Sequence, residues 1–138
     1  MIIDASDSIL GRLATFAAKK ALLGEEVSVV NCEKALMTGS KSNIVEKLSK
    51  RNELGQPQQG PFFPKKANLF VRRVIRGMVP FKTARGKAAF GRVKCYTGVP
   101  DELSKEKAEK IREAAELASL NAKYISVGEI CRIIGGKE

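Results

Sequence analysis

The chain has 138 residues, of which 43% are hydrophobic and 29% are charged, and its formal net charge is +10. These values are typical of one globular domain, and no apolar run approaches the roughly 18 residues that cross a bilayer. There is no histidine, and the three cysteines show no CxxC spacing, which excludes the usual zinc frameworks and histidine-dependent triads. We expect small buried cysteines in a cytoplasmic protein without a secretory signal.

The first third of the chain is predicted to form a strand–helix–strand unit with two parallel, adjacent strands. Ile2 and Ile3 begin the first strand, and residues 26–32 are rich in valine and suit the second. Asp7 or Ser8 is expected to cap the helix between them, and Gly24 to end it. The helix itself is indicated by apolar residues at helical spacing: Leu10, Leu13, Ala14, Ala17 and Ala21.

The middle of the chain is predicted to contain two further helices, at about residues 42–52 and 66–78. Between them, "ELGQPQQGPFFPKK" contains three prolines and two glycines and is typical of a long surface loop. Residues 81–91 are rich in Gly and Lys and are expected to be irregular, whereas "RVKCYTG" (92–98) is expected to be a strand.

The C-terminal third is predicted to hold a helix over about residues 101–121, a fourth strand over residues 124–127 and a short helix over residues 129–134. The sum is an α/β fold: a three-layer α/β/α single domain over residues 1–138. Its small, mostly parallel, four-stranded sheet would carry a basic insertion between the second and third strands.

The positive charge is concentrated in one segment, residues 54–100. This segment contains ten Lys and Arg residues and no Asp or Glu, whereas the rest of the chain has 15 basic and 15 acidic residues. The entire net charge therefore belongs to the segment, which predicts a polyanionic partner. The ten residues are Lys65, Lys66, Arg72, Arg73, Arg76, Lys82, Arg85, Lys87, Arg92 and Lys94.

On the helix over residues 66–78, apolar residues form one stripe, and Arg72, Arg73 and Arg76 lie on another face. An ordinary solvated face is the alternative interpretation, but such a face normally carries charges of both signs. Phe81 and Phe90, farther along, suit either stacking on an unpaired base or anchoring in the core. RNA fits the segment better than duplex DNA, because no recognition helix, finger or dimerisation heptad is present.

Small-molecule sites have little support in the sequence. "TGSKS" (38–42) lacks the glycine spacing of a P-loop, although a helix start at Lys41 is able to hold one phosphate of a polymer. No GxGxxG follows the first strand, and the carboxylates suggest no catalytic pair. We therefore expect binding rather than catalysis, with no cofactor, no metal and no small-molecule substrate.

Three motifs in order also carry a family resemblance: "IDASDSILGRLA", "VVNCEKALMTG" and "RGMVPFKTARGKAAFGRVKCYTGVP". Together they resemble the large-subunit ribosomal protein L13 family in its archaeal and eukaryotic form, over nearly the whole chain. The resemblance implies an α/β fold with a four-stranded parallel sheet and binding to large-subunit ribosomal RNA (rRNA). By position it implies rRNA contacts at Arg76, Lys82, Arg85, Lys87 and Arg92, with Arg12 marking the first helix. Residues 62–66 depart from the His and Arg of relatives but keep two lysines.

The leading hypothesis is therefore a structural, non-enzymatic protein of the large subunit in the cytoplasmic ribosome. Its expected partners are rRNA and neighbouring large-subunit proteins, and no membrane. Two alternatives stay open: a regulatory nucleic-acid-binding module outside the ribosome, and a nucleotide-using enzyme whose basic segment grips a nucleic acid. The expected RNA contacts are Arg12, Lys41 and the ten cations of residues 54–100.

Overall fold

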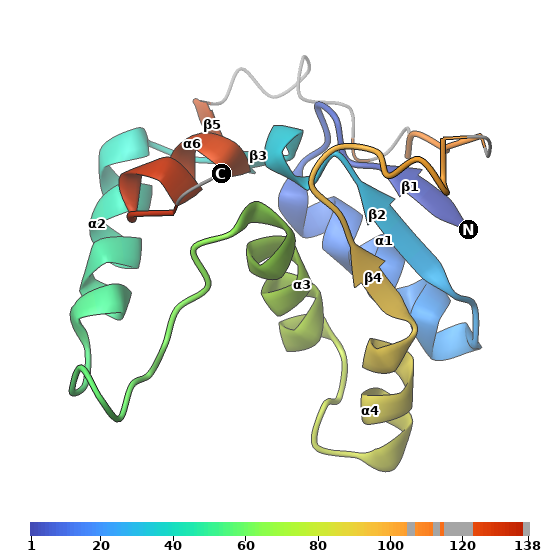
Figure 1. The fold of residues 1–138 in the computed structure, drawn as a ribbon, viewed down its shortest axis with the longest axis horizontal. Helices are drawn as coiled ribbons and strands as arrows, with labels where there is room; N and C mark the ends of the chain where they lie inside the picture. The colour runs from blue at the N-terminus through green and yellow to red at the C-terminus, as the bar shows by residue number, and fades with distance from the viewer. Residues whose placement is uncertain (105–106, 112–113, 115–122, 137–138) are drawn as a thin grey trace.

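The computed structural model describes residues 1–104, 107–111, 114 and 123–136 (Figure 1). Short strands and helices alternate as far as residue 53, as the sequence predicts, and two further helices follow before the next strand. In chain order the elements are β1 (Ile2–Asp4), α1 (Leu10–Leu23), β2 (Val27–Val30), the 3₁₀ helix η1 (Cys32–Lys34), β3 (Leu36–Thr38), α2 (Lys41–Glu53), α3 (Ala67–Met78), α4 (Ala84–Gly91), β4 (Val93–Cys95), β5 (Tyr124–Ser126) and α6 (Val127–Ile133).

The described residues form two small sheets. The first is parallel, with strand order β1-β2-β4, so the predicted parallel pairing of the first two strands is confirmed. A single parallel bridge between Ile3 and Glu109 continues this sheet beyond β1. The predicted fourth strand, β5, instead pairs antiparallel with β3 in a separate two-stranded sheet. The α/β class is confirmed, but in the described residues the parallel sheet has three strands rather than four.

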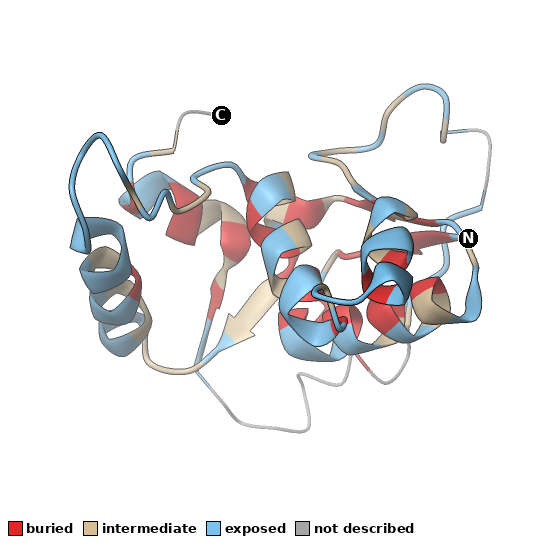
Figure 2. Cartoon of the chain, turned by 90° about the horizontal axis from the view of Figure 1, so that it is seen from below, coloured by how far each residue is buried: buried red, intermediate tan, exposed pale blue. Residues whose placement is uncertain are grey.

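One face of the parallel sheet forms the core. The register pairs Ile3 with Val29 and Val27 with Val93, and residues paired in this way point to the same face. All four belong to one cluster of buried residues that also contains apolar residues of α1, α3 and α4. Figure 2 shows this buried centre, with α2 exposed along most of its surface. The three helices therefore pack on the same sheet face.

Helix α1 follows its predicted apolar stripe, whose five residues are all buried. Gly24 ends the helix with φ of 105°, the left-handed conformation expected of a C-terminal glycine. The predicted cap is wrong: the helix begins at Leu10 after Ile9, and no side chain caps it. Ser8 is instead buried, and its carbonyl oxygen accepts a hydrogen bond from Leu36 N at 2.8 Å.

Residues 84–91 form helix α4, so the expectation of an irregular segment is wrong. Thr83 caps the helix, because its Oγ1 accepts a hydrogen bond from Gly86 N at 3.1 Å. The same hydroxyl donates to the Pro80 carbonyl oxygen at 2.8 Å, which fixes the preceding turn. Gly86 is buried against this turn, so its lack of a side chain permits close packing rather than flexibility.

The predicted helix over residues 101–121 does not form at its beginning. Residues 101–104 make turns, and Glu109 bridges β1 through hydrogen bonds from Asp4 N and to the Ile2 carbonyl oxygen, both at 3.0 Å. Residues 105–106, 112–113 and 115–122 lie outside the described part of the chain. The short C-terminal helix is confirmed as α6, which Ser126 caps by accepting from Glu129 N at 3.2 Å.

The cysteines are free thiols, and Cys32 and Cys131 are buried as expected. A hydrogen bond with the Cys95 thiol and burial raise the pKa of Cys32, and burial raises the pKa of Cys131 to about 11. Both thiols therefore stay protonated and behave as small apolar side chains. None of the helices in the described ranges is long and apolar enough to cross a membrane.

We predict that Gly86→Ala destabilises the protein by about 1–3 kcal/mol, because the added Cβ overpacks a site closed by backbone. An ideal Cβ at Gly86 would lie 2.0 Å from the Pro80 carbonyl oxygen. Urea unfolding followed by circular dichroism measures the change. The matched control in the same helix is Gly91→Ala, where a Cβ meets no atom within 4 Å. Equal stability of the two variants would contradict this packing.

Candidate nucleic-acid interface

Helix α3 has one buried and one basic face. Phe70, Val71 and Ile75 are at most 3% exposed and belong to the core. Arg73 and Arg76 are exposed, and Arg72 is half-buried at the edge of the two faces. This division follows from the helical spacing of the apolar residues, which fixes the rotation of the helix against the sheet. The arginines are therefore displayed outward by the packing of the opposite face.

Each of these arginines stacks on a different phenylalanine. The guanidinium carbon lies 4.7 Å from the ring centre for Arg72 on Phe90, 5.0 Å for Arg73 on Phe63 and 4.2 Å for Arg76 on Phe81. Stacking of this kind attracts the cation to the ring face and restrains its side chain. It also leaves the N–H groups at the guanidinium edge for other acceptors, which is the geometry needed to bind phosphate oxygens.

The phenylalanines also contact one another. Phe63 meets Phe70 edge to face at 5.8 Å between ring centres, and Phe81 meets Phe90 in the same way at 5.4 Å. The loop before α3 and the segment around α4 are thus joined to α3 through rings that lie under the arginines. Of the two roles predicted for Phe81 and Phe90, the structure favours anchoring, because both rings are half-buried and already stacked.

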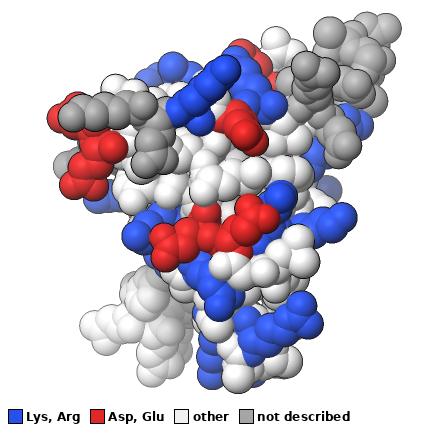
Figure 3. All heavy atoms as spheres, turned by 90° about the vertical axis from the view of Figure 1, so that its right-hand side faces the viewer, with Lys and Arg blue, Asp and Glu red and all other residues white. Residues whose placement is uncertain are grey.

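None of the ten cations between residues 54 and 100 forms a salt bridge with a described residue. The ion pairs between described residues, Lys20–Glu25, Lys41–Glu129 and Lys50–Glu46, all lie outside this segment. Figure 3 shows the consequence on one face: its lower end, where α4 lies in Figure 1, carries Lys and Arg without Asp or Glu. The Nε atom of Arg72 is buried without a hydrogen-bond partner. The positive charges of residues 54–100 are therefore not neutralised by carboxylates of the described residues.

The cations that follow α3 divide between surface and structural positions. Lys82, Arg85 and Lys87 are exposed on the turn before α4 and on α4 itself, and they extend the charge of the α3 face. Arg92 is half-buried, and its Nη1 donates to the Ala21 carbonyl oxygen at 3.3 Å, which ties β4 to the end of α1. Lys94 is exposed and pairs with Ser28 in the sheet, on the face opposite the core.

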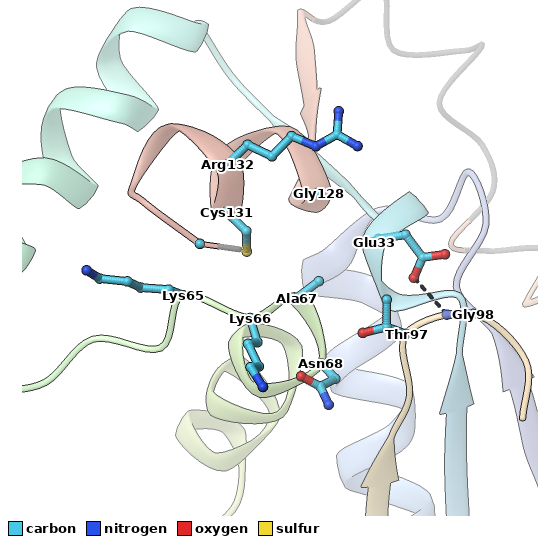
Figure 4. Close-up of a pocket in the computed structure, with 11 residues that line it drawn as sticks. Glu33, Lys65, Lys66, Ala67, Asn68, Thr97, Gly98, Gly128, Cys131 and Arg132 are labelled. Carbon is cyan, nitrogen blue, oxygen red and sulfur yellow. Dashed lines mark hydrogen bonds between the residues drawn. The ribbon is translucent and has the colours of Figure 1, made fainter. Parts of the chain in front are cut away.

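Lys65 and Lys66 lie apart from the arginines, beside a hollow of about 580 Å³ at the start of α3 (Figure 4). Residues of η1, α6 and the loop after β4 complete the lining, and Glu33 accepts a hydrogen bond from Gly98 N there at 3.1 Å. Arg132 also lines the hollow, and Figure 4 shows that the charged ends of Lys65, Lys66 and Arg132 point in different directions. The hollow therefore lacks converging cations.

Lys41 and Arg12 lie on other elements. Lys41 begins α2, and its ammonium group pairs with Glu129 of α6, which already compensates its charge. Arg12 is exposed on α1, where it lines a hollow of about 740 Å³ together with Lys19 and Lys20. Lys19 and Lys20 are not among the cations expected from the sequence to contact RNA. Their spacing from Arg12 on the predicted helix was the available signal.

The fold and the surface define a class of protein. It is an α/β protein whose net positive charge lies in one segment, residues 54–100, and the cations of that segment form no ion pair with a described residue. Residues 1–102 match the family described as ribosomal protein L13. The chain is 42% identical over 137 residues to large ribosomal subunit protein uL13 of Methanococcoides burtonii, covering 99% of this chain and 98% of that one. It is 38% identical over 135 residues to the uL13 protein of Thermoplasma acidophilum, with 98% of each covered.

The chain therefore belongs to the ribosomal protein L13 family. This membership confirms the resemblance seen in the three motifs. It also confirms the prediction of a ribosomal protein instead of a nucleotide-using enzyme.

We predict that Arg76 and Phe81 are energetically coupled, since the guanidinium stacks on the ring. In a double-mutant cycle of Arg76→Gln and Phe81→Leu, the coupling in the free energy of unfolding should be about 0.5–1 kcal/mol. The control cycle pairs Phe81→Leu with Arg85→Gln, because Arg85 is exposed and stacks on no ring among the described residues. Those two changes should be additive, and equal coupling in both cycles would contradict the stacked arrangement.

Proposed function

We propose that the chain is a structural constituent of the large ribosomal subunit in the cytoplasmic ribosome. There it binds large-subunit rRNA through the outer face of α3 and the segment around α4. The uL13 proteins it resembles are named for that subunit. A position in the large subunit also implies contacts with neighbouring large-subunit proteins.

The observation that carries the proposal is the set of three arginines held side by side on α3. Their guanidinium groups lie over phenylalanine rings, and their charges have no carboxylate partner in the described structure. Such groups match phosphate oxygens, which are densely spaced along an RNA backbone. The lack of a major-groove reading element favours recognition of RNA shape and backbone over duplex DNA.

The proposed contacts are expected to contribute unequally to the affinity for RNA. Arg72, Arg73 and Arg76 form the centre, and Lys82, Arg85 and Lys87 extend it along α4. Lys65, Lys66 and Lys94 would reach RNA only at the margins, since they lie away from the arginines. Arg92 and Lys41 already have partners in the protein, and Arg12 lies on a neighbouring helix. We therefore expect the first six to dominate binding.

The first test is the salt dependence of binding to a large-subunit rRNA fragment. If roughly half of the ten cations contact phosphate, log K should fall with log salt with a slope of about −3 to −4. Replacing Arg72, Arg73 and Arg76 together by Gln should weaken binding and reduce the magnitude of that slope by about 2. Filter binding at several salt concentrations measures both quantities.

The matched control removes the same charge elsewhere, by replacing Lys47, Lys107 and Lys123 with Gln. These lysines are exposed and lie outside residues 54–100. The control should keep most of the affinity and slope, and circular dichroism should show that both variants are folded. Equal losses in the two variants would contradict a localised interface, and unchanged binding by the α3 variant would show that its basic face is only solvated surface.

A further inference from the structure

A hollow of about 330 Å³ lies on the outer surface of α3, between the helix and the loop before it. Its lining combines apolar and aromatic groups with cations and includes Phe62, Phe63, Leu69, Arg72, Arg73 and Arg76. All three arginines proposed to bind RNA therefore border one apolar surface. Phosphate binding alone does not require an apolar surface, whereas the flat faces of nucleotide bases can pack on one.

Phe62 is the aromatic residue of this hollow that the protein leaves uncovered. Its exposure is 71%, and that of Leu69 across the hollow is 46%. The structure describes all six phenylalanines, and each of the other five stacks on a ring or a cation of a described residue. Phe62 does neither. A large apolar ring without a partner on a protein surface is typical of a binding site.

The position of Phe62 is nevertheless fixed. Its carbonyl oxygen accepts a hydrogen bond from Arg73 Nη1 at 3.0 Å, and the next residue, Phe63, lies under the same guanidinium. The backbone that carries the exposed ring is thus held against α3 directly after the Cα atom of residue 62. Because this backbone is already ordered, binding of a flat ligand to the ring has to restrict only the Phe62 side chain, which keeps the cost in conformational entropy low.

The charged residues of the hollow indicate what kind of ligand it binds. No carboxylate lines the hollow, and its three arginines are held by stacking, with only Arg73 donating a hydrogen bond to a described protein atom. A flat, partly apolar group attached to negative charges satisfies both features of the site. Nucleotide bases have a π-face for the ring and phosphates for the arginines, and only an unpaired base exposes that face.

We propose that this hollow binds one unpaired RNA base, which stacks on the Phe62 ring while the adjoining phosphates contact Arg73 and Arg76. The inference rests on the proposed rRNA-binding function and adds a base site to a surface otherwise expected to contact only the backbone. Stacking tolerates any base, so the site selects an unpaired nucleotide rather than a sequence.

The test uses the full chain and two RNA probes of equal length and charge: a 12-residue oligouridylate, and the same sugar–phosphate strand without bases. The chain has no tryptophan, so Phe62→Trp introduces a single indole at the site. Oligouridylate should quench its fluorescence, and the abasic strand should bind without quenching. Tyr124→Trp is the control, at an exposed aromatic position on β5, and neither probe should quench it.

Affinity provides the second measurement. The unmodified chain should bind oligouridylate about 10-fold more tightly than the abasic strand, as expected for one stacked base. Phe62→Ala should remove this difference without weakening abasic binding, Phe62→Tyr should keep it, and Tyr124→Ala should leave it unchanged.

The possible failures are distinguishable. Equal affinities of the unmodified chain for the two probes, or a preference that survives Phe62→Ala, would overturn the base site and leave backbone binding intact. If neither probe, nor the large-subunit rRNA fragment, binds in a salt-dependent manner, the proposed function itself fails, and the base site fails with it.

Discussion

Helix α3 is anchored in the core by Phe70, Val71 and Ile75, which are almost fully buried. That anchoring sets the rotation of the helix and turns its arginines outward. It also brings α3 against α1 and β4, so the basic face is supported by the parallel sheet instead of projecting on a free arm. Burying an unpaired arginine would be costly, and the apolar stripe ensures that the charges meet solvent or a ligand.

The arrangement around α3 gives the basic segment a defined shape. Three guanidinium groups lie on phenylalanines from the preceding loop and from the region of α4. Phe81 and Phe90 meet edge to face, and Phe63 meets Phe70 of α3 in the same way. Like charges repel when they are close, and that repulsion opposes folding of the isolated chain. Ring stacking offsets part of it, and a polyanion would remove the rest. The same residues therefore serve the stability of the segment and the proposed recognition of RNA.

Hydrophobic periodicity predicted α1 and α3 well, because each carries an apolar stripe that local sequence reveals. It carries less weight for α2, which forms near its predicted range with Leu48 as its one buried residue. It failed at α4, where Gly86 and Gly91 suggested irregular backbone; the cap at Thr83 and the close packing of Gly86 on Pro80 decide the structure. Three-residue strands such as β3 and β5 carry too little pattern to reveal their pairing. The charge pattern identified the arginines, but their ring partners lie up to 18 residues away and only the fold brings them together.

The central claim is that residues of α3 and α4 contact large-subunit rRNA. Ultraviolet crosslinking in intact ribosomal large subunits washed at high salt, with the peptide and the RNA side both mapped, tests it most directly. We expect crosslinked peptides within residues 62–92, joined to nucleotides of large-subunit rRNA. Crosslinks confined to residues outside 54–100, or loss of the chain from the washed subunits, would contradict it.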